Sequence, residues 1–216
     1  MEQLLFGKIS PTDFLQILHE YGFVYFYNLD TAPLNISVED FQKLELYANR
    51  FFTLPLNKKM RYYIGSSPNH RGYVPVSEKG AYGDEKSRVY EAFDMSYTTY
   101  FKDEYSYQKL MGENIWPEED IKGFKEVVEG YYKQMFLLGK SILSILAQSF
   151  DLSSDYFEEY TKYPPAQLRL INYLDNDLLK VKDKIKMGAH TDYECFTFIY
   201  QSSPGIQGYI QQNKKF

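Results

Sequence analysis

Apolar side chains recur every three or four positions in three stretches of the chain, which is the spacing of one face of an α-helix. The first stretch follows Ser10 and Pro11, which suit a helix N-cap and a first helical position, and Gly22 is placed to end it. The second helix should begin at Ser37, and the longest at residues 116–117 (Trp-Pro). The predicted apolar stripe of the longest helix is Phe124, Val128, Tyr131, Met135, Leu138, Ile142, Ile145 and Leu146.

Short runs rich in β-branched and aromatic residues predict strands. They occupy residues 23–27, 167–173, 196–200 and 205–210. Residues 66–83 are instead rich in Gly, Pro and Ser, which favours an ordered loop. Most of the predicted helices precede most of the strands. This order is typical of an α+β domain in which helices pack on an antiparallel sheet.

The composition is that of a folded globular protein. Hydrophobic residues make up 44% of the 216 positions, charged residues 25% and aromatic residues 18%. No uninterrupted apolar run approaches membrane-spanning length, and residues 1–6 lack the basic and apolar regions of a secretory signal. The single cysteine, Cys195, excludes an internal disulfide and suits a reducing compartment. We therefore expect a cytoplasmic protein with no membrane partner.

The charge balance argues against nucleic-acid binding. The formal net charge is −5, which provides no basic field for a phosphate backbone. Lys58 and Lys59 follow Pro55 at a predicted helix break, and we expect both ammonium groups to be solvated. A small-molecule substrate is the expected partner.

The chemically most informative segment is Gly188-Ala189-His190-Thr191-Asp192, which precedes the apolar run at residues 196–200. A His and an Asp two residues apart at the mouth of a strand can hold one face of a divalent metal. They would supply two of the three ligands of the 2-His-1-carboxylate triad, which leaves positions on Fe(II) open for substrate and O₂. The alternative from spacing alone is a surface His beside a carboxylate, without function.

The remaining candidate side chains have simpler interpretations. His19 lies in a predicted helix and His70 in a predicted loop, so neither is spaced to supply a third, strand-borne ligand. Cys195 is interpreted as a small buried residue, because thiolates belong to other metal sites. Arg169 lies four residues before Tyr173 and thus on the same face of the strand. We interpret Arg169 as structural, and if buried it would need a carboxylate partner.

An ordered set of motifs resembles the isopenicillin N synthase-like, 2-oxoglutarate/Fe(II)-dependent dioxygenases. His190 and Asp192, with the run that follows, are similar to the metal-binding segment of that family. Residues 168–173 are similar to the strand whose closing Tyr reaches the 2-oxoglutarate carboxylate, although Leu174 stands where the family usually has Pro. Further matching segments, in the family's order, are residues 20–24, 51–55, 71–75, 91–94 and 114–117.

This resemblance implies an α+β fold, a double-stranded β-helix (jelly roll) with N-terminal and backing helices. Residues 1–100 would form the N-terminal helix and strand region, residues 101–163 the backing helices, and residues 164–216 the first part of the jelly-roll core. The resemblance also implies a non-haem oxygenase acting on an unidentified small molecule. His190 and Asp192 would hold Fe(II), Tyr173 would bind the co-substrate 2-oxoglutarate, and O₂ would be consumed. No catalytic residue beyond the metal ligands is expected.

The family completes its site with a later His and a later Arg, and neither residue type follows Asp192 here. We therefore expect a chain that lacks the last strands of the fold and binds Fe(II) weakly. We also expect it to self-associate through uncovered strand edges. Two alternatives stay open: an O₂-dependent oxidase that uses no 2-oxoglutarate, and a non-catalytic truncated fragment or binding protein.

Overall fold

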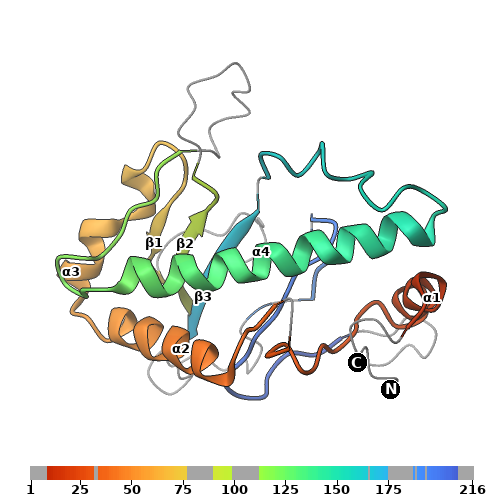
Figure 1. Ribbon diagram of the computed structural model, residues 1–216. Coiled ribbons are helices and arrows are strands. Elements are labelled where there is room, and N and C mark those ends of the chain that lie inside the picture. Colours follow the sequence, from red (N-terminus) through yellow and green to blue (C-terminus); the bar gives the residue numbers. More distant parts are fainter. Residues whose placement is uncertain are drawn as a thin grey trace. The chain divides into compact units, whose positions relative to one another are not determined.

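The computed structural model describes residues 9–31, 34–76, 90–98, 112–164, 166–174, 187, 189–192 and 194–208 (Figure 1). Gly188 and residues 209–210, which were part of the expected motifs, lie outside the described residues. The chain divides into two compact units. The first unit comprises Met1–Gln42, Tyr131–Lys162 and Phe198–Phe216, and the second comprises Lys43–Gly130 and Tyr163–Thr197.

An antiparallel sheet of three strands forms the centre of the second unit (Figure 1). Its strands lie in the order β1 (Gly72–Val74), β2 (Tyr90–Ser96) and β3 (Gln167–Tyr173). The prediction of a strand at residues 167–173 is confirmed, because β3 has those bounds. The expectation of a loop throughout residues 66–83 is wrong, because β1 lies within it and pairs with β2.

Aromatic side chains cover one face of this sheet. Phe93 of β2 contacts Phe51 of α2 (Val38–Phe52) with ring centroids 4.8 Å apart. It also contacts Phe124, the first residue of α4 (Phe124–Ser149), at 5.3 Å. All three rings are 0% exposed, so this face is the aromatic core of the second unit.

The opposite face of the sheet carries a smaller aliphatic and aromatic cluster. Val74, Tyr90 and Ala92 form its buried centre, and Ile171 and Met187 pack against them. Alternate residues of a strand point to opposite faces, so these residues and the Phe93 cluster lie on different sides of β2.

Helix α1 (Pro11–Tyr21) begins and ends as the sequence predicts. The Ser10 hydroxyl accepts a hydrogen bond of 3.1 Å from the Asp13 backbone N–H, which satisfies an otherwise unpaired donor of the first turn. Gly22 ends the helix with φ of 79° and donates its N–H to the Leu18 carbonyl at 2.8 Å.

Helix α2 also begins where the sequence predicts. Ser37 and Asp40 exchange two hydrogen bonds between side chain and backbone, at 2.9 and 3.2 Å, in the manner of a capping box. In the first unit, Phe41 contacts the rings of Tyr131 and Tyr200. The short elements that follow α2 are α3 (Leu56–Lys59), η1 (Met60–Tyr62) and η2 (Ile64–Ser66).

Helix α4 begins later than the sequence predicts, at Phe124 rather than at residues 116–117. Residues 118–123 form turns instead, and Gly123 takes a φ of 85°, which interrupts right-handed helix. The Glu118 carboxylate accepts from the backbone N–H groups of Gly123 at 3.0 Å and Lys125 at 2.5 Å. Glu118 therefore satisfies donors at the true start of the helix.

The predicted strands at residues 23–27 and 196–200 are wrong. Neither segment forms a strand, and only Phe26 takes part in a single β-bridge. In the part of the chain that the structure describes, residues 205–208 likewise form no strand. High β-propensity favours an extended backbone, whereas a strand also needs a partner in a ladder.

Within the part of the chain that the structure describes, no helix is both long and apolar enough to cross a membrane.

Candidate metal and co-substrate site

The structure brings His190 and Asp192 together. His190 Nε2 lies 3.4 Å from Asp192 Oδ1, and the two side chains are 35% and 42% exposed. Ligand atoms stand about 2.0–2.2 Å from a bound ion, so two neighbouring ligands of an octahedral ion lie about 3 Å apart. An imidazole nitrogen and a carboxylate oxygen at this separation fit a shared Fe(II) after a small adjustment.

A further side chain, Thr197, contacts the pair. Its Oγ1 donates a hydrogen bond of 2.5 Å to Asp192 Oδ2. Thr197 was not predicted as a site residue from the sequence, where it stands as one polar residue between Phe196 and Phe198. That interruption of an apolar run is the signal that was available.

Tyr173 closes β3 on the sheet face that carries Tyr90, with the two ring centroids 5.6 Å apart. Met187 packs against the Val74–Tyr90–Ala92 cluster on the same face. The chain thus reaches this face three residues before His190. Burial, followed by the nearby Tyr90, raises the pKa of the Tyr173 phenol, which keeps it a neutral hydrogen-bond donor.

Arg169 has the carboxylate partner that the sequence led us to expect. Its Nε and Nη2 atoms contact the two carboxylate oxygens of Asp94 at 2.8 and 2.7 Å. Asp94 is 1% exposed, and Asp94 and Arg169 lie opposite each other in the register of β2 and β3. This two-point ion pair neutralises a buried charge and fixes the strand register.

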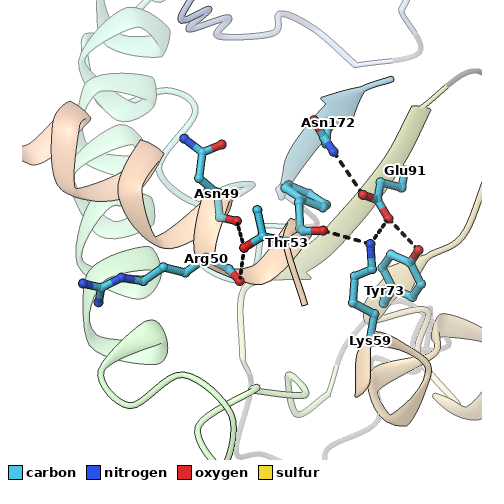
Figure 2. Close-up of polar contacts among 8 residues, drawn as sticks. Asn49, Arg50, Thr53, Lys59, Tyr73, Glu91 and Asn172 are labelled. Atoms are coloured by element: carbon cyan, nitrogen blue, oxygen red, sulfur yellow. Dashed lines mark hydrogen bonds and ion pairs between the residues drawn. The ribbon is translucent and has the colours of Figure 1, made fainter. Parts of the chain in front are cut away.

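A buried polar network lies on the sheet face that carries Phe93, opposite to the face of Tyr90 and Tyr173 (Figure 2). The Glu91 carboxylate accepts from Lys59 Nζ and from the Tyr73 hydroxyl, each at 2.6 Å, and from Asn172 Nδ2 at 3.0 Å. Lys59 also donates to the carbonyl of Phe52, the last residue of α2, at 3.0 Å. The expectation that Lys59 is solvated is wrong, because it is only 7% exposed.

This network ties the end of α2 to the end of β3. Asn172 precedes Tyr173, so its contact with Glu91 anchors the strand next to the candidate co-substrate ligand. Burial, and then the hydrogen bond to Glu91, raise the pKa of the Tyr73 phenol, which therefore acts as a donor to the carboxylate. The lysine charge compensates the buried carboxylate charge.

The other candidate residues are exposed side chains. His19 is exposed on α1, and His70 is exposed with a φ of 54°. Cys195 is exposed, so the interpretation of it as a buried residue is wrong. Within the residues that the structure describes, no three His, Cys, Asp or Glu side chains gather closely enough to hold a metal ion.

Comparison with known proteins identifies the family. A family model described as non-haem dioxygenase in morphine synthesis, N-terminal, matches residues 12–119, which is half of the chain. The chain belongs to this non-haem dioxygenase family. The expected likeness to isopenicillin N synthase-like, 2-oxoglutarate/Fe(II)-dependent dioxygenases is confirmed.

Individual relatives of this dioxygenase chain agree. It is 30% identical to a 2-oxoglutarate-Fe(II) type oxidoreductase of Aspergillus fumigatus, covering 73% of this chain and 48% of the relative. It is 25% identical to the 2-oxoglutarate-dependent dioxygenase thnC of Trichoderma harzianum, covering 88% of this chain and 58% of the relative. The chain therefore spans about half the length of these curated relatives.

A solved structure shares the fold. A full-length protein of Neurospora crassa, crystallised with alpha-KG, superposes with a TM-score of 0.66 at 22% identity. The match covers 85% of this chain and 55% of the Neurospora crassa protein. The helices and the three-stranded sheet described above therefore belong to the fold of the Neurospora crassa protein.

Proposed function

We propose that the chain carries part of the active site of an Fe(II)- and 2-oxoglutarate-dependent dioxygenase that oxidises a small molecule. His190 and Asp192 are the Fe(II) ligands, and Tyr173 is a ligand of 2-oxoglutarate. The observation that supports this most strongly is the 3.4 Å separation of His190 Nε2 and Asp192 Oδ1 in a member of the dioxygenase family. Relatives named for 2-oxoglutarate and iron support the choice of metal and co-substrate.

The chain's own residues have distinct roles in this proposal. The neutral His190 imidazole donates its lone pair through Nε2, and the Asp192 carboxylate offsets positive charge on the ion. The Tyr173 phenol, kept protonated, donates a hydrogen bond to a carboxylate of 2-oxoglutarate. Fe(II), 2-oxoglutarate and O₂ together supply the oxidising chemistry when bound.

We further propose that residues 164–216 form the first part of a jelly-roll core. Residues 101–163 would supply the backing helices, and residues 1–100 the N-terminal region. β3 supports this assignment, because it contributes the candidate 2-oxoglutarate ligand from its last position. The match to the Neurospora crassa structure supports the same fold.

We also propose that the chain self-associates through the outer edge of β3. Among the described residues, β3 pairs only with β2, so its second edge has no ladder partner there. An edge of this kind can pair with another chain. Sedimentation velocity should show a concentration-dependent dimer, and replacing Leu168 by Pro should weaken it. A monomer at all concentrations would contradict this proposal.

Metal binding tests the proposed site. Free Mn(II) gives a sharp six-line electron paramagnetic resonance signal that is lost when the ion binds protein, so the titration measures a dissociation constant. We expect the chain to bind Mn(II), and His190→Ala to reduce the affinity at least about tenfold. His19→Ala is the matched control and should bind as wild type, because His19 is an exposed histidine on α1. Equal binding by all three proteins would contradict the site.

The co-substrate is tested separately. Addition of 2-oxoglutarate should tighten Mn(II) binding by wild type. In the proposed site the metal ion and 2-oxoglutarate bind together, so each should raise the affinity for the other by the same factor. Tyr173→Phe should show a smaller effect. No effect of 2-oxoglutarate on wild type would favour the oxidase alternative. Any succinate release by this chain should depend on His190, so His190→Ala should abolish it.

A further inference from the structure

The two carboxylate oxygens of Asp192 have different neighbours. Oδ1 lies 3.4 Å from His190 Nε2, on the side where an ion would be shared. Oδ2 accepts the hydrogen bond from Thr197 Oγ1 at 2.5 Å. A hydroxyl that donates to a carboxylate at this length makes a short, charge-assisted hydrogen bond. The hydroxyl therefore holds one oxygen while the other faces the imidazole.

The chain around Thr197 accounts for the direction of its hydroxyl. Phe196 and Phe198 are partly buried, whereas Thr197 and Ile199 are exposed. This alternation is the side-chain pattern of an extended backbone, although the segment forms no strand. Thr197 thus lies on the more exposed side of this segment, where its hydroxyl meets the exposed Asp192 carboxylate.

We propose that Thr197 is a positioning residue of the metal site, whose hydroxyl makes Asp192 a ligand through Oδ1 alone. This inference rests on the proposed function, in which His190 and Asp192 bind Fe(II). A carboxylate that binds through one oxygen occupies one coordination position instead of two. More positions then stay open for 2-oxoglutarate and O₂, as a facial triad requires. Hydrogen bonds to ligating side chains orient the ligands and tune metal affinity.

The test compares two substitutions at one position. Thr197→Val keeps the shape of the side chain and removes the hydroxyl, whereas Thr197→Ser keeps the hydroxyl and removes the methyl group. In the Mn(II) titration we expect Thr197→Val to weaken binding about 10- to 100-fold, and Thr197→Ser to bind within about threefold of wild type. Urea unfolding should give the same midpoint for all three proteins, because Thr197 is exposed.

Each outcome decides the proposal. Wild-type affinity in Thr197→Val would overturn the positioning role, as would equal weakening in both variants or a matching loss of stability in Thr197→Val. The His190→Ala titration distinguishes this from failure of the proposed function. If His190→Ala weakens Mn(II) binding and Thr197→Val does not, only the role of Thr197 fails. If His190→Ala has no effect, the metal site and the role of Thr197 fail together.

Discussion

Glu91 is a carboxylate that is only 3% exposed to solvent. Moving such a charge out of water is costly unless a countercharge and hydrogen bonds replace the lost hydration. Lys59 supplies the countercharge, and the Tyr73 hydroxyl and the Asn172 amide supply further donors. The register of β2 and β3 at this point is therefore fixed by polar contacts as well as by packing.

Lys59→Met should strongly destabilise the protein. The substitution keeps the length of the side chain but leaves the Glu91 carboxylate buried without a countercharge, which typically costs about 3–5 kcal/mol. Lys58→Met is the matched control, because Lys58 is 43% exposed and its partner is Asp120. Urea unfolding monitored by circular dichroism measures the free energy of unfolding of both variants. If Lys59→Met lowers this free energy no more than Lys58→Met does, the buried pair contributes little to stability.

Residue roles could be predicted from the sequence where the strand pattern alone determines them. Arg169 was interpreted as a structural residue that would need a carboxylate partner if it were buried, and Asp94 is that partner. The burial of Lys59 could not be predicted, because Glu91 lies 32 positions away and meets it only after β2 pairs within the sheet. The hydrogen bond of Thr197 likewise depends on how the chain turns after Asp192.

At the scale of elements, the long helix α4 shows how local pattern and packing combine. Of its predicted apolar stripe, Phe124, Val128, Leu138 and Ile142 are at most 3% exposed. In the first unit, Leu138 is 1% exposed, whereas its neighbour Leu137 is 55% exposed. The helical period thus identified the buried side of the helix correctly.

Leu138→Asp should unfold the first unit, because it places an unpaired carboxylate in an apolar interior. The free energy of unfolding should fall by more than about 3 kcal/mol, a loss that few single substitutions cause. Leu137→Asp introduces the same residue on the exposed side of the same helix. Far-ultraviolet circular dichroism and the yield of soluble protein should separate the two variants. A soluble Leu138→Asp variant with wild-type helix content would contradict the packing.

The helix ends followed from sequence more reliably than the strands did. Ser10, Ser37 and Gly22 act through neighbours within a few positions, so their roles can be predicted locally. The prediction of strands at residues 23–27 and 196–200 was wrong, because a strand needs a ladder partner from elsewhere in the chain. The start of α4 was misplaced because Gly123 and the Glu118 contacts outweighed the Trp-Pro pattern.

At the scale of the whole molecule, the raised pKa values of two buried tyrosines predict that the folded state loses stability at high pH. Burial, and then a hydrogen bond to Asp120, raise the pKa of Tyr62 from 10.0 to about 12. Burial and the nearby Tyr200 raise the pKa of Tyr131 from 10.0 to about 12. A raised pKa stabilises the folded state below the unfolded value, so this contribution is present below about pH 10 and is lost up to about pH 12.

The free energy of unfolding should therefore fall between about pH 10 and 12. Urea titrations at pH 8, 10 and 11 measure this fall. In a Tyr62→Phe, Tyr131→Phe double variant the decline should be shallower, whereas Tyr160→Phe, at a position that is 67% exposed, should follow wild type. Identical pH dependence in the double variant and wild type would show that these phenols do not couple to folding.

The chain belongs to the non-haem dioxygenase family, and its described residues bring together two metal-ligand candidates, His190 and Asp192. The ordered motifs carried the family prediction, since they are spread over the chain. The positions of His190 and Asp192 in space depended on the backbone between them, which spacing alone does not fix.

Iron-directed cleavage tests the metal site most directly. Fe(II) bound to a protein, given ascorbate and hydrogen peroxide, oxidises and cuts the chain next to its ligands, and mass spectrometry locates the cuts. We predict oxidation and cleavage close to His190 and Asp192 in wild type and in His19→Ala, and their loss in Asp192→Asn. Cleavage centred elsewhere in the chain, or unchanged in Asp192→Asn, would contradict the assignment of these two residues as the iron ligands.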